Sequence, residues 1–157
     1  MRYLIFAILG VLAVTLKGDR ASIKSKVNFL TDDFDNLFVK YAKEVGISPK
    51  LLKAISANES QIGKFVEYEP IGGTSGLMHI KLSTARDYEP DLLIYDMDSH
   101  EVQIRTGAKH LRRLSDVFSG DEKKIVMSYN QGEGNTKKGR EVSEYWERYL
   151  RNKSRLG

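Results

Sequence analysis

Apolar side chains recur at helical spacing along most of the chain. The first such stretch covers residues 34–45, with inward positions Phe34, Leu37, Phe38, Tyr41, Ala42 and Val45. Gly46 follows as a stop signal, and Ser48-Pro49 supplies the cap and first position of a second helix. In that helix Glu59 falls near the face of its apolar residues, Leu51, Leu52 and Ile55. The pattern therefore places a carboxylate at the end of a core-facing helix, where a cleft can open.

The second half of the chain continues with turns and helices. Residues 63–76 are irregular and rich in glycine, and Ser83 is expected to cap a short helix that runs through Tyr88. Residues 89–98 are predicted to form a loop with an apolar middle. A helix over 99–114 is expected to turn five residues largely inward, Val102, Ile104, Ala108, Leu111 and Leu114.

Two further helices complete the pattern. Asp121 caps a helix with Ile125, Val126 and Tyr129 inside, and a last helix from about 141 to 152 carries Tyr145, Trp146 and Tyr149. The glycine-rich segment 131–139 between them is predicted to be flexible. Little of the chain alternates as a strand does, so we expect a mainly α, single-domain protein.

The N-terminus departs from this amphipathic pattern. Met1-Arg2 is followed by the apolar run YLIFAILGVLAVTL and then by KGDR, which is typical of a secretory signal. A run of about 14 residues is short for a membrane span of about 20. We expect residues 1–21 to be a signal peptide or a membrane anchor, with the apolar run 3–16 as the anchoring part. A linker over 22–33, a domain over 34–152 and a tail over 153–157 would follow, outside the cytoplasm.

Composition narrows the classes of function. A formal charge of +4 is too mild to indicate nucleic-acid binding, although it suits an anionic polymer such as a bacterial cell wall as well as an ordinary solvated surface. The absence of cysteine excludes disulfides and thiol catalysis. His79, His100 and His110 lack the spacing of metal ligands, so neither a metal nor a cofactor is expected.

Four motifs occur in a recognisable order. They are Glu59-Ser60, Gly76-Leu77-Met78-His79-Ile80, Ser128-Tyr129-Asn130-Gln131-Gly132, and Tyr145 within REVSEYWERYL. Together they resemble the lytic transglycosylase family with the soluble-transglycosylase (goose-lysozyme-like) catalytic domain, whose motifs are Glu-Ser, Gly-Leu-Met-Gln, Ala-Tyr-Asn and a late tyrosine. The segment IRTGAKHLRRL also resembles a helix of that family. The resemblance covers roughly residues 34–150 and implies a lysozyme-like fold of the α+β type with little strand.

The resemblance implies cleavage of the β-1,4 bond between N-acetylmuramic acid (MurNAc) and N-acetylglucosamine (GlcNAc) in peptidoglycan. Glu59 would first protonate the glycosidic oxygen and then take the proton of the C6 hydroxyl, which closes a 1,6-anhydro ring without consuming water. A free glutamate titrates near about 4.3, so we expect surroundings at Glu59 that disfavour its charged form. Ordinary glycosidases need two carboxylates, and no second acid lies in a motif. Glu67 and Glu69 could reach the groove, although solvated loop charges are the simpler interpretation.

The resemblance also assigns supporting roles. Ser60 would bond the substrate or steady Glu59, Gly76 would let the backbone approach a sugar, and Met78 would line the groove or the core. Tyr129 and Tyr145 would place hydroxyls near Glu59 or the sugar. Asn130 would bind substrate or tie its loop to the helix, while Trp146 would stack on a sugar or fill the core.

Two residues depart from the family motifs. His79 stands in place of glutamine, and Ser128 stands in place of alanine. Histidine also donates and accepts hydrogen bonds, but it titrates near neutral pH. Acid conditions could therefore lower activity, or contacts to the sugar could differ.

Two alternatives to a lytic transglycosylase stay open. One is a hydrolytic lysozyme on the same fold, and the other is an inactive wall-binding or assembly component. The small size suggests local opening of the wall for a secretion, conjugation or phage-entry machine, which would be the partner besides peptidoglycan.

Overall fold

The computed structural model describes residues 34–62 and 76–156. The expected signal or anchor, the linker, and the loop acids Glu67 and Glu69 lie outside these ranges. The chain divides into two compact units, Met1–Asp35 and Asn36–Gly157, and the second unit contains the four motifs. Among the described residues, no helix is both long enough and apolar enough to cross a membrane.

The described residues form helices and contain no strand. A helix over residues 34–45 comes first. It is followed by α2 (Pro49–Ser60), α3 (Leu82–Arg86), the 3-10 helix η1 (Ile94–Asp98), α4 (His100–Val117), α5 (Glu122–Gln131), α6 (Glu133–Lys137) and α7 (Ser143–Arg155). The mainly helical class predicted from the sequence is confirmed for this part of the chain.

Local end signals set several of these boundaries as predicted. Gly46 ends the helix over 34–45 with a φ of +72°, a conformation that glycine adopts without strain. Ser48 caps α2, since its Oγ accepts a hydrogen bond from the Leu51 N–H, and Pro49 takes the first helical position. Asp121 caps α5 in the same way through the Lys124 N–H.

Three predictions about the connecting segments are wrong. Lys81 is the residue before α3 and makes no capping side-chain hydrogen bond, so Ser83 lies inside the helix. The predicted loop over 89–98 contains η1, which forms because the Asp96 side chain accepts the Leu93 N–H. The segment 131–139 contains α6, and its ends are tied where Gln131 donates to the Arg140 carbonyl at 2.7 Å.

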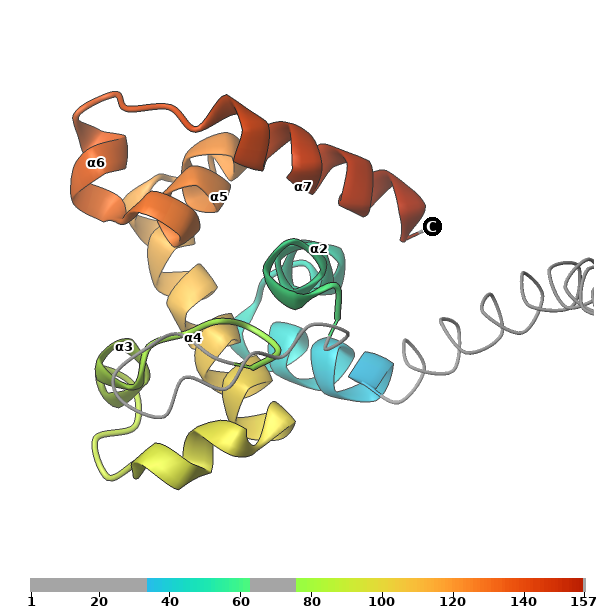
Figure 1. The fold of residues 1–157 in the computed structure, drawn as a ribbon, viewed down its shortest axis with the longest axis vertical. Coiled ribbons are helices and arrows are strands. Elements are labelled where there is room, and N and C mark those ends of the chain that lie inside the picture. The colour runs from blue at the N-terminus through green and yellow to red at the C-terminus, as the bar shows by residue number, and fades with distance from the viewer. Residues whose placement is uncertain (1–33, 63–75, 157) are drawn as a thin grey trace, which may run out of the picture. The chain divides into compact units, whose positions relative to one another are not determined.

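Packing centres on α2 and α4. The helix α2, seen end-on in Figure 1, packs most extensively against α7 and also against α4, which in turn contacts α3, η1 and α5. Asn58 links α2 to α7: its side chain donates to the Tyr145 carbonyl at 3.2 Å and accepts from the Asn152 side chain at 2.8 Å. This contact brings the end of α2 against a helix that begins more than 80 residues later.

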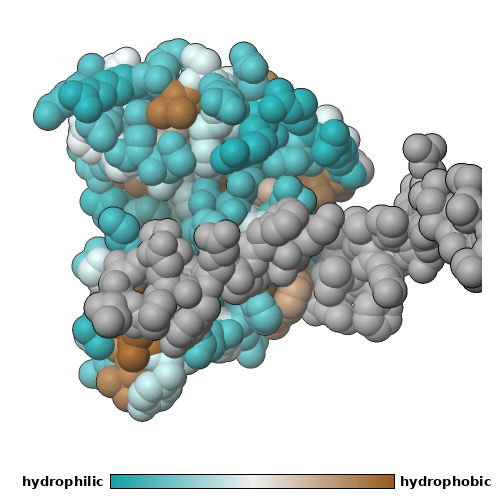
Figure 2. Space-filling view, in the orientation of Figure 1, coloured by the Kyte–Doolittle hydropathy of each residue, from teal (hydrophilic) through white to brown (hydrophobic). Residues whose placement is uncertain are grey.

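The surface is mostly hydrophilic on the face shown in Figure 2. A small apolar area lies at the η1 end of the molecule, where Leu93, Ile94 and Tyr95 are exposed. Val39 and Leu150 are also exposed, while most other strongly apolar residues of the described ranges are buried, with Leu52, Ile55, Leu77, Met78, Ile104 and Leu111 fully so.

Candidate active site

Glu59 lies in the last turn of α2 with its side chain only 14% exposed. Its two carboxylate oxygens have different partners. The Tyr145 hydroxyl donates to Oε1 at 2.5 Å, and Nδ1 of His79 lies 3.5 Å from Oε2. The carboxyl group is therefore held between α7 and the GLMHI segment (residues 76–80), which are both distant from it in sequence.

Buried hydrogen bonds fix the GLMHI segment under this carboxyl group. Ser60 donates to the Leu77 carbonyl at 2.8 Å, and Ser56, one turn earlier on α2, donates to the same carbonyl at 3.1 Å. The Tyr129 hydroxyl of α5 donates to the Met78 carbonyl at 2.9 Å. Because donors from two helices end on consecutive carbonyls, the position of His79 is determined by α2 and α5 together.

A glutamine on α4 also supports the GLMHI segment. Gln103 is fully buried; it accepts the Met78 N–H at 2.9 Å and donates to the Met97 carbonyl at 2.5 Å. Gly76 makes room for it, since a Cβ there would lie 1.7 Å from Gln103 Nε2, and the φ of +80° suits glycine. Gly76 thus lets the backbone approach Gln103 closely.

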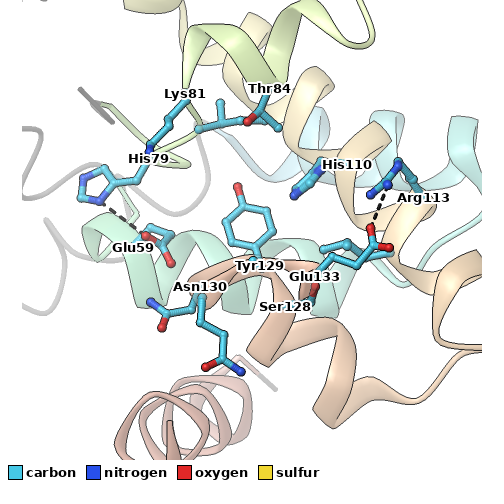
Figure 3. Close-up of a pocket in the computed structure, with 14 residues that line it drawn as sticks. Glu59, His79, Lys81, Thr84, His110, Arg113, Ser128, Tyr129, Asn130 and Glu133 are labelled. Atoms are coloured by element: carbon cyan, nitrogen blue, oxygen red, sulfur yellow. Dashed lines mark hydrogen bonds and ion pairs between the residues drawn. The ribbon is translucent and has the colours of Figure 1, made fainter. Parts of the chain in front are cut away.

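His79 has an unusual backbone and an unusual ring environment. Its φ is +45°, in the left-handed region that side-chain-bearing residues seldom occupy. The conformation turns the imidazole toward Glu59 (Figure 3). In the described part of the chain, Nε2 of this ring is buried without a hydrogen-bond partner. Strained residues with unsatisfied polar atoms occur preferentially at functional sites.

A pocket of about 480 Å³ opens beside Glu59, within the range typical of small-ligand sites. Its walls come from the end of α2, the segment after His79, α3, α4, α5 and the start of α6. In Figure 3 Tyr129 lies between Glu59 and the Arg113–Glu133 ion pair. In that pair a guanidinium nitrogen of Arg113 is 2.7 Å from a carboxylate oxygen of Glu133. The pocket therefore has a Glu59 end and a distal end, which we define by His110, Arg113, Ser128 and Glu133.

The two tyrosines near Glu59 remain protonated at neutral pH. Burial raises the pKa of the Tyr145 hydroxyl, and the Glu59 charge and hydrogen bond raise it further. Burial also raises the pKa of Tyr129 well above its ordinary value, with a smaller contribution from Glu59. Both hydroxyls are therefore donors, Tyr145 to the carboxyl group itself and Tyr129 to the backbone beneath it.

The structure separates the predicted site residues into two groups. Glu59, His79, Tyr129 and Asn130 line the pocket, and Tyr145 contacts Glu59. Ser60, Gly76 and Met78 are buried behind it and act on the backbone or the core. Met78 would be contacted by a Cβ at Gly107, so its side chain packs on α4.

Two further residues have few contacts that bear on their expected roles. Asn130 is exposed at the pocket, and its side chain makes no hydrogen bond with another described residue. Trp146 does not line this pocket and stacks on the buried Tyr149 with ring centroids 5.4 Å apart, which agrees with the core alternative rather than with stacking on a sugar.

Sequence reasoning missed several pocket residues, among them Lys81, Thr84, His110, Arg113 and Glu133. The only signal for two of them was IRTGAKHLRRL, which contains His110 and Arg113 but gives no indication of which way each side chain faces. Glu133 lies in the segment that was expected to be flexible.

The surroundings of Glu59 are less apolar than expected. The helix before it is buried, with Leu52 and Ile55 fully enclosed, yet a hydroxyl and an imidazole meet the two carboxylate oxygens. The arrangement shields the group from bulk water and orients it, which are two requirements of a general acid and base.

Comparisons with known proteins agree with the motif order. Residues 36–149 match the family model described as Transglycosylase SLT domain. The chain is 34% identical over 109 residues to peptidoglycan transglycosylase gp16 of Escherichia phage T7, covering 65% of this chain and 8% of that protein. Its fold resembles an inactive mutant of lytic transglycosylase Slt from Pseudomonas aeruginosa, with a TM-score of 0.58 and 21% identity over 76% of this chain and 21% of the other.

The chain thus spans less than a tenth of the phage protein and about a fifth of the Pseudomonas protein. The family match covers well over half of this chain and includes all four motifs, and the recognition from the sequence is thereby confirmed. The chain belongs to the Transglycosylase SLT domain family.

Proposed function

We propose that this protein is a peptidoglycan lytic transglycosylase that cleaves the MurNAc-β-1,4-GlcNAc bond and leaves a 1,6-anhydro-MurNAc end. The observation that carries the proposal is the Glu59 carboxyl group, largely buried at a pocket wall and held by Tyr145 and His79. It is the acidic residue of the family's Glu-Ser motif. The phage relative is named a peptidoglycan transglycosylase, which supports peptidoglycan as the substrate.

Glu59 serves as acid and then as base in this proposal. It gives its proton to the glycosidic oxygen as the bond from that oxygen to C1 of MurNAc breaks. The resulting carboxylate takes the proton of the C6 hydroxyl as O6 bonds to C1. Glu59 ends protonated, as it began, and neither water nor a cofactor is consumed. The hydroxyl of Tyr145 donates to the carboxylate formed between the two steps, a charge-assisted bond that stabilises it.

The other predicted residues support this group. Tyr129 and Ser60 hold the backbone of the GLMHI segment, and so hold His79 against Glu59. The imidazole of His79 contacts the acid directly, where the family motif has glutamine. Asn130 lies at the pocket and contacts the glycan, while Gly76 and Met78 shape the segment from beneath.

Digestion of purified cell wall followed by mass spectrometry tests the proposal. The full chain should release fragments that end in 1,6-anhydro-MurNAc, and Glu59→Gln should reduce their rate by 10² or more. Glu44→Gln, at an exposed position on another helix, is the matched control and should keep full activity. Reducing MurNAc ends alone would reject the transglycosylase.

A hydrolytic lysozyme is the second candidate, and Glu133 favours it as a second carboxylate in the pocket. Hydrogen bonds from Lys137 and Arg113 lower the pKa of Glu133, so it remains an ion-paired carboxylate. That pairing leaves it poorly placed to activate water. If Glu133→Gln abolishes release of reducing ends while wild type produces them, the hydrolase replaces the transglycosylase.

The remaining parts of the proposal concern location and context. We place the catalytic domain over 34–152, after a signal or anchor at 1–21 and a linker at 22–33, with a tail at 153–157. The protein then acts on peptidoglycan in the periplasm, membrane-anchored through residues 3–16 or virion-associated, and opens the wall locally for a secretion, conjugation or phage-entry machine. The relation to a phage protein supports the phage-entry context. An inactive wall-binding role requires that Glu59→Gln change neither turnover nor phenotype.

A further inference from the structure

His110 is a pocket residue that the proposed mechanism does not use. It lies in α4 at the distal end of the pocket, and its ring centroid is 5.5 Å from that of Tyr129. In Figure 3 its ring is on the other side of Tyr129 from Glu59. Its Nδ1 lies 2.9 Å from the hydroxyl oxygen of Tyr88, which follows α3.

The tautomer of His110 is linked to the role that Tyr88 takes in this contact. Burial lowers the pKa of His110 to about 4 and raises the pKa of Tyr88, so both groups are neutral at pH 7. Either group can donate in this contact, and we assign the Tyr88 hydroxyl as the donor to Nδ1 of His110, because it has no other acceptor among the described residues. A neutral imidazole that accepts at Nδ1 carries its hydrogen at Nε2.

The Nε2–H group of His110 is available to a ligand. It makes no hydrogen bond to another described residue. It is also not among the fully buried side-chain atoms without a partner in the described ranges, which are Nε2 of His79 and Oγ of Ser128. Since His110 lines the pocket, this donor can be reached from the pocket.

A second polar group at the distal end also lacks a partner. Ser128 lines the pocket, the residue is 2% exposed, and its hydroxyl oxygen is buried without a hydrogen-bond partner in the described ranges. A buried hydroxyl without a hydrogen bond is costly, and a ligand that bonds it recovers part of that cost. The cation at this end, Arg113, is already paired with Glu133, so the end as a whole favours a neutral acceptor.

We infer that His110 is a specificity-determining residue whose Nε2–H donates to the N-acetyl carbonyl of a sugar at the distal end of the pocket, with Ser128 beside it and Tyr88 fixing the ring tautomer. The N-acetyl carbonyl is the strongest neutral acceptor that an amino-sugar strand offers. The apolar side chains of Leu114 and Ile80, which also line the pocket, suit its methyl group. This inference rests on the proposed function, since it takes the glycan strand as the ligand.

Binding measurements test it without turnover. In the full chain carrying Glu59→Gln, calorimetry should show that His110→Leu weakens binding of a GlcNAc hexamer roughly fivefold to tenfold, the value of one neutral hydrogen bond. The same His110→Leu substitution should not change binding of the de-N-acetylated hexamer, because that ligand lacks the N-acetyl carbonyl that accepts the hydrogen bond. His110→Gln, which restores an N–H donor, should recover most of the affinity. An equal loss with both hexamers would mean a merely structural role and would overturn the inference.

Nitrogen-15 NMR of His110 gives an answer even if the leucine variant does not fold. The unmodified ring should show Nε2 protonated and Nδ1 bare, and the Nε2 signal should move when the GlcNAc hexamer is added. Tyr88→Phe should produce a mixture of tautomers and a partial loss of affinity. An Nε2 signal that does not respond to the hexamer contradicts the inference. If instead Glu59→Gln leaves wall digestion intact, the proposed function fails, whatever His110 does.

Discussion

At the scale of single residues, the site consists of one carboxyl group and the groups that orient it. Tyr145 contacts Glu59 directly, whereas Tyr129 acts through the Met78 carbonyl. The predicted site residues therefore fall into two groups by their position relative to the pocket. Glu59 and His79 face the pocket, and Ser60, Gly76 and Met78 hold its floor from behind.

Tyr145→Phe removes only the hydroxyl that donates to Glu59. A hydrogen bond to a charged group contributes about 1.5–3 kcal/mol, so we expect the rate of wall digestion to fall roughly tenfold to a hundredfold. Tyr149→Phe is the matched control, one turn later on α7, where the hydroxyl donates to Glu122 instead. It should lower stability slightly and leave the rate unchanged. Equal rate losses in the two variants would contradict the assignment of Tyr145.

Gly76→Ala tests the support of the GLMHI segment. The new Cβ would overlap the buried Gln103 side chain, which must then release the Met78 N–H and the Met97 carbonyl. Gly120→Ala is the control, because Gly120 has a similar φ of +78° and open space around it. We expect the control to cost about 1–2 kcal/mol of unfolding free energy and Gly76→Ala to cost several kcal/mol more, measured by chemical denaturation. Similar costs would show that Gln103 is dispensable.

At the scale of elements, an ion-paired carboxylate fastens the turn after α3 to α4. Glu89 accepts hydrogen bonds from Arg105 at 2.6 and 2.7 Å and from Lys109 at 2.8 Å. The side chains are mostly buried, with Glu89 19% exposed. This contact helps hold α3 and η1, and so the Lys81 and Thr84 wall of the pocket, against α4.

The pH dependence of stability follows from the Glu89 contact. Hydrogen bonds from Arg105 are the largest cause that lowers the pKa of Glu89, to about 2 from an ordinary 4.5. Because the folded value is the lower one, the stabilisation is complete above pH 4.5 and is lost as the pH falls toward 2. Glu89→Gln should therefore lower the unfolding free energy at pH 7 by on the order of 2–3 kcal/mol. Denaturation at pH 7 and pH 2.5 should show the difference shrinking, while Glu44→Gln stays near wild type at both.

At the scale of the whole molecule, the unit Asn36–Gly157 has one continuous set of contacts. Helix α2 packs on α7 and α4, and α4 connects α3, η1 and α5 to them. The pocket depends on that set, because its walls come from α2, α3, α4, α5 and α6, and Glu59 in its wall is contacted by Tyr145 of α7. A change at α7 therefore reaches Glu59, which lies in α2.

We expect this unit to unfold in one cooperative transition, because no part of its core is separate from the rest. The chain has a single tryptophan, Trp146, which stacks on Tyr149 in α7 and reports on the last helix. Its fluorescence and the far-UV circular dichroism of all helices should give the same melting temperature. A fluorescence transition that precedes the dichroism change would show that α7 detaches first, and with it the Tyr145 contact to Glu59.

The sequence by itself determined the local features and the family. Helix ends at Gly46, Ser48-Pro49 and Asp121 follow from backbone geometry and capping, which involve neighbouring residues only. The four motifs likewise identified the family, because their order along the chain can be recognised without any knowledge of tertiary contacts. Where a local pattern was weak, as in the segments that form η1 and α6, the prediction was wrong.

Only the tertiary structure decided which side chains meet. Tyr145 and Glu59 are 86 positions apart, and their contact depends on how α7 crosses α2. The same is true of Gln103 under the GLMHI segment and of His110 facing the pocket beside Tyr129. Periodicity gives the face of a helix but not the partner against which that face packs, because packing is settled by the shapes of all the elements together.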